Sequence, residues 1–203
     1  MDMTKKFEKP PEKKIILASS SVYRRALLER LQLPFTFESP EIDEAVLSGE
    51  SPENTCKRLA REKASTVARN NPSAIVIGSD QVAVVNGVAI SKPGSYGPAV
   101  VQLREMSGQR ITFHSAVCLT QQETQKTIEF SVPTHVSFRT LDDAEIHRYL
   151  VAEEPYDCAG SAKSEGLGIT LLEGIESTDP TALIGLPLIA LSKALRSFGI
   201  ALP

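Results

Sequence analysis

An aspartate interrupts a strongly apolar stretch of this chain, IVIGSDQVAVV at residues 75–85. The apolar residues on both sides predict two strands, over 74–78 and 81–85. Burying an ionised carboxylate is unfavourable unless it is paired, bound to a metal ion or protonated. We therefore expect a turn at Gly78 that leaves Asp80 exposed at the end of a strand.

The length and charge of the chain limit what it can be. Its 203 residues suffice for one large domain or two small ones. The apolar share of 41% and the charged share of 23% are typical of a globular protein. A net charge of −3 offers no general attraction for nucleic acid, so no such partner is expected. No apolar run reaches the about 18 residues of a membrane span, so no membrane partner is expected either.

The first residues and the cysteines favour a cytoplasmic protein. Residues 1–14, MDMTKKFEKPPEKK, are polar and charged, and we expect a disordered tail there rather than a signal peptide. The three cysteines, Cys56, Cys118 and Cys158, are odd in number and far apart. This pattern favours reduced thiols and contains no CxxC spacing typical of zinc.

Residues 15–203 alternate between patterns typical of strands and of helices. We expect strands at 15–18, 110–120, 127–139 and 170–177, and a strand giving way to a polar loop at 35–45. The pair Asn86–Gly87 predicts a hairpin turn. We expect helices after Ser20 or Ser21, over 51–68, over 98–106, over 141–151 with a capping box of Thr140 and Asp143, and over 185–199. This order predicts a single α/β domain with a mixed sheet.

Two arginines begin the first of these helices, where the helix dipole disfavours cations. Arg24 and Arg25 follow three serines, and helix starts, hydroxyls and guanidinium groups all suit a bound phosphate. A solvated basic turn is the alternative reading of the same residues.

Carboxylates provide a second signal. Asp80 and the loop residues Glu41, Asp43 and Glu44 could together hold Mg²⁺ or Mn²⁺ against phosphates, although surface acids are the ordinary alternative. Lys63 and Lys92 are further candidates for phosphate contacts, and residues 163–166, KSEG, form a candidate substrate loop. Because no nucleophile elbow, P-loop or dinucleotide motif is present, the residues favour a metal-assisted phosphoanhydride hydrolase and leave its substrate open.

Seven segments in order make the chain resemble the Maf family of nucleoside triphosphate pyrophosphatases, which is linked to septum formation. They are LASSSVYRRALLERL, LAREKA, VIGSDQVAVV, SKP, MSGQ, AGSAKSEGLGI and LIGLPL. The resemblance implies a Maf/Ham1-like fold over residues 15–203, with a long curved mixed sheet, flanking helices and a cleft between two lobes. It also implies hydrolysis of a nucleoside triphosphate between the α and β phosphates with a divalent metal cation, and it raises the expectation of a homodimer.

The resemblance assigns roles to individual residues. Asp80 would activate water, and Glu44 would be a second catalytic carboxylate, both lying near the metal. The phosphate-binding residues would be Ser19, Arg24, Arg25, Lys63 and Lys92.

Two positions resemble the group of the family that acts on 7-methyl-GTP, and a third departs from it. Gln81 follows the aspartate, and Glu165 could accept hydrogen bonds from guanine and favour a cationic methylated ring. Tyr23 stands where that group usually carries Trp, and it still offers an aromatic face to such a base. Two alternatives stay open: the same reaction on dTTP, UTP or another modified nucleotide, and a nucleotide-binding regulator of cell division with little turnover.

Overall fold

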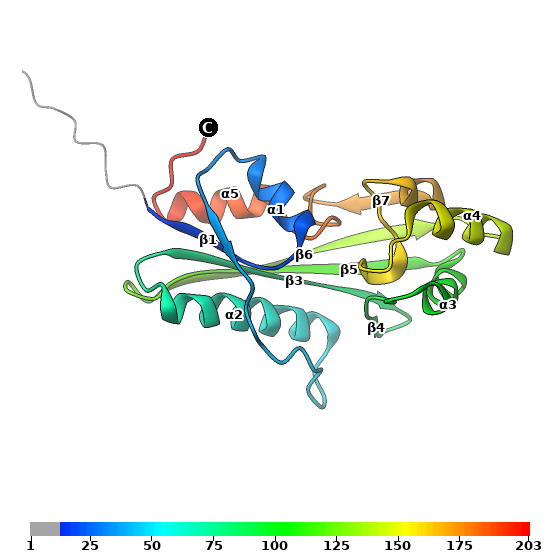
Figure 1. Cartoon of the computed structure of the whole chain (residues 1–203), viewed down its shortest axis with the longest axis horizontal. Coiled ribbons are helices and arrows are strands. Elements are labelled where there is room, and N and C mark those ends of the chain that lie inside the picture. The colour runs from blue at the N-terminus through cyan, green and yellow to red at the C-terminus, as the bar shows by residue number, and fades with distance from the viewer. Residues whose placement is uncertain (1–12) are drawn as a thin grey trace, which may run out of the picture.

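The computed structural model describes residues 13–203, and a seven-stranded sheet runs through them (Figure 1). The strands lie in the order β2-β1-β3-β5-β6-β7, and β4 also pairs with β3. The pairs of β1 with β2 and with β3 are parallel, and the other pairs are antiparallel. The strand bounds are β1 (Ile15–Ala18), β2 (Thr36–Glu38), β3 (Ile75–Val85), β4 (Val88–Ile90), β5 (Arg110–Gln121), β6 (Lys126–Phe138) and β7 (Leu172–Ser177). The expectation of a mixed α/β fold is confirmed.

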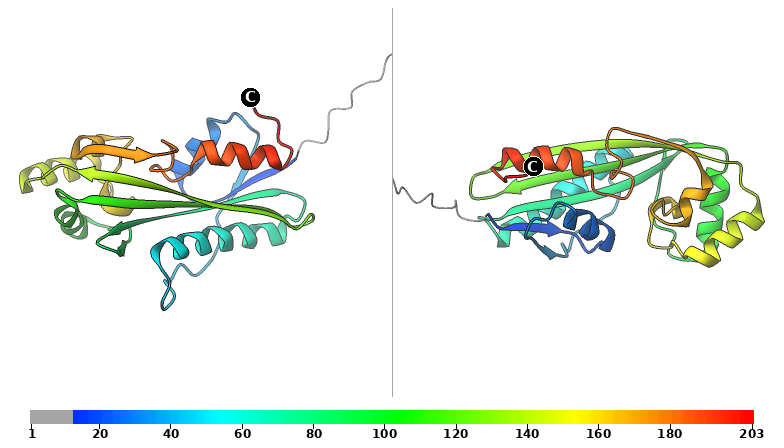
Figure 2. Two further views of the ribbon diagram at one scale, coloured as in Figure 1. Left: turned by 180° about the vertical axis from the view of Figure 1, so that it is seen from behind. Right: turned by 90° about the horizontal axis from the view of Figure 1, so that it is seen from above.

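Helices cover both faces of the sheet at one end and gather beyond it at the other (Figures 1 and 2). The helix α2 (Pro52–Asn70) lies on one face, while α1 (Val22–Glu29) and α5 (Leu188–Ser197) lie on the opposite face. The helices α3 (Tyr96–Met106) and α4 (Asp143–Glu153) pack together at the far end, near the short 3₁₀ turns η1 (Ala159–Ser161) and η2 (Leu167–Leu171). No helix within residues 13–203 has the length and apolar character needed to cross a bilayer.

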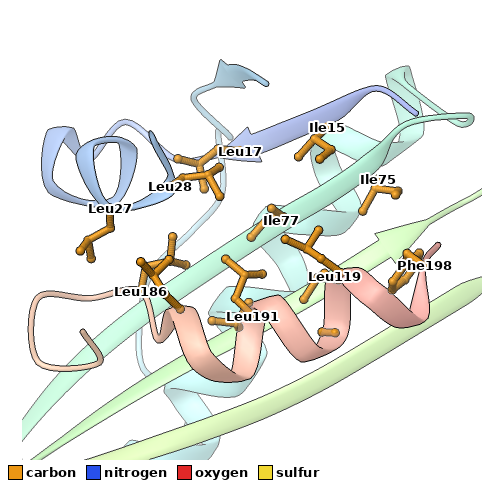
Figure 3. Close-up of a cluster of buried hydrophobic side chains, with 14 residues drawn as sticks. Ile15, Leu17, Leu27, Leu28, Ile75, Ile77, Leu119, Leu186, Leu191 and Phe198 are labelled. Carbon is orange, nitrogen blue, oxygen red and sulfur yellow. The ribbon is translucent and has the colours of Figure 1, made fainter. Parts of the chain in front are cut away.

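Three apolar clusters hold these layers together. One joins α1 and α5 to the sheet through residues such as Leu28, Ile77 and Leu191 (Figure 3). A second joins α2 to the opposite face, where its small residues Ala60 and Ala64 allow close packing. The third lies at the far end between α3, α4 and the long strands. The molecule therefore has two packed ends joined by continuous strands.

The strand β3 corrects the expected turn at Gly78. It runs unbroken from Ile75 to Val85, so the two strands expected at 74–78 and 81–85 are one, and Asp80 lies in its middle. β5 pairs with β3 throughout residues 76–84 and keeps the chain extended. On the other edge, β1 pairs only with residues 75–78 and β4 only with residues 83–85. Residues 79–82 therefore face a gap between two strands.

Several local expectations are confirmed, and others shift by one turn or less. Ser21 and Ser51 cap α1 and α2 as the sequence predicts. The prediction that Thr140 and Asp143 form the capping box of α4 is wrong, because Asp142 and Glu145 form it. The helix α3 begins at Tyr96, two residues before the predicted start. Residues 1–12 of the expected tail lie outside the described residues, whereas its last two lysines contact Phe198 and Asn71.

Gly78 allows α2 to pack closely against β3, and a substitution there can test this. A Cβ at this position would lie 2.2 Å from the Ala60 carbonyl oxygen and 2.6 Å from the Ala64 nitrogen, both backbone atoms of α2. We expect Gly78→Ala to lower the free energy of unfolding by about 1–3 kcal/mol, because α2 must move away from β3. Urea denaturation measures this change. The matched control is Gly97→Ala, where a Cβ would meet nothing within 4 Å, and equal destabilisation by both variants would contradict the account.

Candidate active site

The gap along β3 opens into a cleft of about 440 Å³. This volume falls within the range of roughly 300–1,000 Å³ typical of ligand sites. β1 and β4 both end at the gap, so Ala18 leads directly to the serines 19–21, and Ile90 leads to Ser91 and Lys92. Seven of the residues proposed from the sequence line this cleft: Ser19, Arg24, Glu44, Lys63, Asp80, Gln81 and Lys92.

Lys63 is the ion-pair partner of the buried Asp80. Its ammonium lies 2.7 Å from Asp80 Oδ1 and 2.7 Å from Glu44 Oε1. The side chains of Lys63 and Asp80 are 9% and 10% exposed, whereas that of Glu44 is 61% exposed. The buried carboxylate is thus stabilised by a buried ammonium, and both charges lie at the wall of the cleft.

Cations dominate the electrostatics of the cleft. Burial would by itself raise the pKa of Glu44, but the hydrogen bond and charge of Lys63 oppose this effect. The charges of Lys92 and Arg24 act in the same direction and bring the pKa of Glu44 below its ordinary value. Glu44 therefore stays ionised among three cationic side chains. Such a surplus of positive charge suits a polyphosphate.

The two adjacent arginines of α1 lie in different environments. Arg24 lines the cleft, and its Nε donates to the Gly185 carbonyl oxygen at 3.0 Å, which fixes the guanidinium there. Arg25 instead stacks on the ring of Phe37 in β2, 3.4 Å from the ring centre. The lining of the cleft does not include Arg25, so the structure separates it from the other phosphate-binding candidates.

A smaller pocket adjoins the cleft and brings together the three residues expected to set substrate preference. Tyr23, Gln81 and Glu165 all line it, along with Phe113 and Asp157. It shares Arg24, Gln81 and Lys92 with the larger cleft, so the two spaces are continuous. The Tyr23 hydroxyl donates to Asp157 Oδ1 at 3.3 Å. Burial, with the neighbouring Cys158 and Asp157, raises the pKa of Tyr23 and keeps this donor protonated.

The strand pleat places Asp80 and Gln81 on opposite faces of the sheet. Asp80 points toward α2, while the Gln81 amide nitrogen donates to the carbonyl oxygens of Ala182 and Leu183 on the other face. Because only the nitrogen of an amide can donate, these bonds fix the orientation of the Gln81 side chain. Gln81 also lines the smaller pocket, and an amide oxygen is an acceptor for the N–H groups of a base.

Two groups of residues around the site carry no signal in the sequence. Asp157 is a second acid of the smaller pocket, within a turn that carries no recognisable motif. Arg58 and Glu50 tie the loop that carries Glu44 to α2, and Glu50 accepts from Arg58 Nε and Nη2 at 2.9 Å each. A helical arginine with a glutamate eight residues earlier is not a motif either, because the loop conformation alone brings them together.

The carboxylates fit a divalent metal ion. Glu44 and Asp80 come from different elements and converge on one ammonium, so both oxygens could contact an ion that also contacts phosphate. Mg²⁺ is commonly held by one or two carboxylates with substrate phosphates and water. Within residues 13–203, no group of three or more His, Cys, Asp or Glu side chains is arranged as a metal site. The loop acids Glu41 and Asp43 do not line the cleft, and Asp43 caps the Ala45 amide.

Comparisons with known proteins agree with this architecture. A HAM1 protein from Coxiella burnetii has a similar fold, with a TM-score of 0.51 at 15% identity, over 91% of this chain and 99% of that one. The family model "Maf-like protein" matches residues 14–198. The chain therefore belongs to the Maf family.

Two relatives are similar over nearly their whole length. The protein of Aromatoleum aromaticum (strain DSM 19018 / LMG 30748 / EbN1) is 54% identical, over 94% of this chain and 98% of the relative. The protein of Bordetella avium (strain 197N) is 57% identical, over 92% and 94%. Both are named 7-methyl-GTP pyrophosphatase.

The buried ion pair predicts a stability effect. We expect Lys63→Met to lower the free energy of unfolding by about 3 kcal/mol, because Asp80 would keep its charge without its partner. The double variant Lys63→Met/Asp80→Asn removes that charge and should regain part of the loss. Denaturant unfolding at neutral pH measures both. A double variant less stable than the single one would contradict the pairing.

Glu50 predicts a dependence of stability on pH. Arg58 lowers the pKa of Glu50 from 4.5 to about 2, against burial, with help from Thr55 and the Leu47 amide. A lowered folded-state pKa means that the stabilisation is fully present above pH 4.5 and is lost as the pH falls toward about 2. The stability difference between the native protein and Glu50→Gln should therefore shrink over this interval. Urea denaturation at several pH values measures this difference. A difference that stays constant with pH would refute the role of the Glu50 charge.

Proposed function

We propose that this protein hydrolyses 7-methyl-GTP to 7-methyl-GMP and pyrophosphate, with the assistance of Mg²⁺ or Mn²⁺. The observation that carries the proposal is the Asp80 carboxylate, buried on β3, paired with Lys63 and facing a cationic cleft. The names of the relatives that are more than half identical over most of the chain support the substrate.

The larger cleft would hold the triphosphate. Arg24 and Lys92 lie on its walls, and the hydroxyl and backbone groups of residues 19–21 add donors at the start of α1. Together with Lys63 they would neutralise the charge that grows on the departing pyrophosphate. Arg25 would act on the nucleotide only indirectly, since it stacks on Phe37.

Asp80 would accept the proton of the attacking water. Its place within a paired strand fixes the carboxylate more tightly than a loop would, which favours attack in one direction. Lys63 holds the carboxylate by its Oδ1 atom. Glu44 and Asp80 would hold the divalent ion, which would supply charge neutralisation at the phosphates.

The smaller pocket would hold the base. Glu165 and the Gln81 oxygen are acceptors for the N–H groups of guanine, and the negative charges of Glu165 and Asp157 favour a cationic methylated ring. The Tyr23 ring offers a face to that cation. Tyr gives a weaker cation–π contact than Trp, and this one feature favours a second candidate, the same reaction on a neutral modified nucleotide.

A nucleotide panel tests the proposal. Purified protein is given 7-methyl-GTP, GTP, dTTP, UTP or ITP with Mg²⁺ or Mn²⁺, and pyrophosphate and orthophosphate are measured separately. We expect pyrophosphate, fastest from 7-methyl-GTP. Faster release from another nucleotide would favour the second candidate, and tight binding without either product would favour a regulatory protein.

Neutralising Asp80, the proposed general base, should cause a large loss of activity. We expect Asp80→Asn to lower kcat by at least about 100-fold, because general-base catalysis typically contributes that much. The control is Asp143→Asn, which alters an exposed carboxylate of α4 that pairs with Arg104. Its kcat should be unchanged. Full turnover by Asp80→Asn would overturn the mechanism.

A further inference from the structure

The loop that carries Glu44 lacks regular structure of its own. Residues 39–50 form neither a helix nor a strand between β2 and α2. The Glu44 side chain is 61% exposed, so packing does not determine where its carboxylate lies. Its carboxylate pairs with Lys63, but a pair with so exposed a partner contributes little to holding the backbone of the loop. The contacts that hold the loop backbone against α2 are therefore important for where Glu44 lies.

Arg58 of α2 makes contacts on both sides of this position. Its Nη2 donates to the Ala45 carbonyl oxygen at 2.9 Å, directly after Glu44 in the chain. Its Nε and Nη2 donate to the two carboxylate oxygens of Glu50 at 2.9 Å each, near the end of the loop. Its Nη1 also pairs with Glu62 at 3.2 Å, which fixes the guanidinium on the helix.

Glu50 extends the connection from the other side. It accepts from the Thr55 hydroxyl at 3.0 Å and from the Leu47 amide at 3.4 Å. The side chains of Arg58 and Glu50 are 16% and 13% exposed, so the pair is shielded from water. The network thus ties both the segment after Glu44 and the end of the loop to the helix that carries Lys63.

We infer that Arg58 is a positioning residue, which with Glu50 holds the loop so that the Glu44 carboxylate faces Lys63 and Asp80. The inference rests on the proposed function, because it concerns the use of Glu44 in hydrolysis. Arg58 is not part of the cleft lining, so it acts through the loop and not on the nucleotide. Lysine cannot replace it, since an ammonium cannot reproduce the planar fork that reaches two carboxylate oxygens and a carbonyl.

A double-mutant cycle on kcat tests this role. We expect Arg58→Ala and Arg58→Lys each to lower kcat about 10- to 100-fold, the range expected when a catalytic group is displaced by about 1 Å. In a Glu44→Gln background, Arg58→Ala should lower kcat no further. Arg61→Ala is the matched control, because Arg61 forms an ion pair from the same helix with Glu129, away from the loop, and should leave kcat unchanged.

Hydrogen exchange of the nucleotide-free protein provides a readout independent of activity. In Arg58→Ala, or in Glu50→Gln where the alanine variant does not fold, amides 43–50 should exchange faster while those of β3 keep their rates. Unchanged exchange of the loop, an equal loss of kcat in the Glu44→Gln background, or full rescue by Arg58→Lys would each overturn the inference.

The two proposals fail in different ways. A native protein that releases no pyrophosphate from any nucleotide would overturn the proposed function and, with it, the catalytic role of Arg58. Normal turnover by the native protein and by Arg58→Ala would overturn only the positioning role.

Discussion

The site depends on one ammonium group that lies between two carboxylates. Lys63 is 2.7 Å from both Asp80 and Glu44, and this contact allows an aspartate to lie inside a strand that would otherwise exclude charge. The same contact joins three elements, because α2, β3 and the loop before α2 each supply one partner. The absence of a side chain at Gly78 lets α2 pack closely on β3, and this packing brings the Lys63 ammonium to 2.7 Å from Asp80 Oδ1. Removing the charge of Lys63 would therefore affect both the packing of α2 on β3 and the electrostatics of the cleft.

The two faces of the sheet present different side chains to the site. β1 and β4 stop on either side of residues 79–82, and their ends deliver the serines and Lys92 to the gap. Along the edge of β3 that neither β1 nor β4 covers, Asp80 points toward α2 and Gln81 points toward the segment 182–183. Both line the larger cleft, and Gln81 also lines the smaller pocket. Adjacent residues can thus serve reaction and recognition without competing for the same space. Substitutions in the smaller pocket would then alter substrate preference while leaving the ion pair in place.

Much of this architecture is predictable from sequence, because periodicity and capping are local signals. Ser51 and Pro52 mark the start of α2, and the Asn86–Gly87 turn marks the hairpin of β3 and β4. The unbroken course of β3 was not predictable, because the partner of Asp80 lies 17 residues away on a helix and only the tertiary fold reveals it. For the same reason Arg24 and Arg25 looked equivalent, although one lines the cleft and the other stacks on Phe37. The contacts of Arg58 with the loop also follow from loop conformation, which no local pattern specifies.

The most direct test of the account is a crystal structure with Mn²⁺ and a 7-methyl-GTP analogue whose α–β bridging oxygen is replaced by a methylene group. The anomalous signal of manganese locates the metal independently of the nucleotide. The account predicts the metal at Glu44 and Asp80, the phosphates along Arg24 and Lys92, and the methylated base against Tyr23 and Glu165. A metal bound away from both carboxylates, or a base in the larger cleft with the phosphates in the smaller pocket, would contradict it.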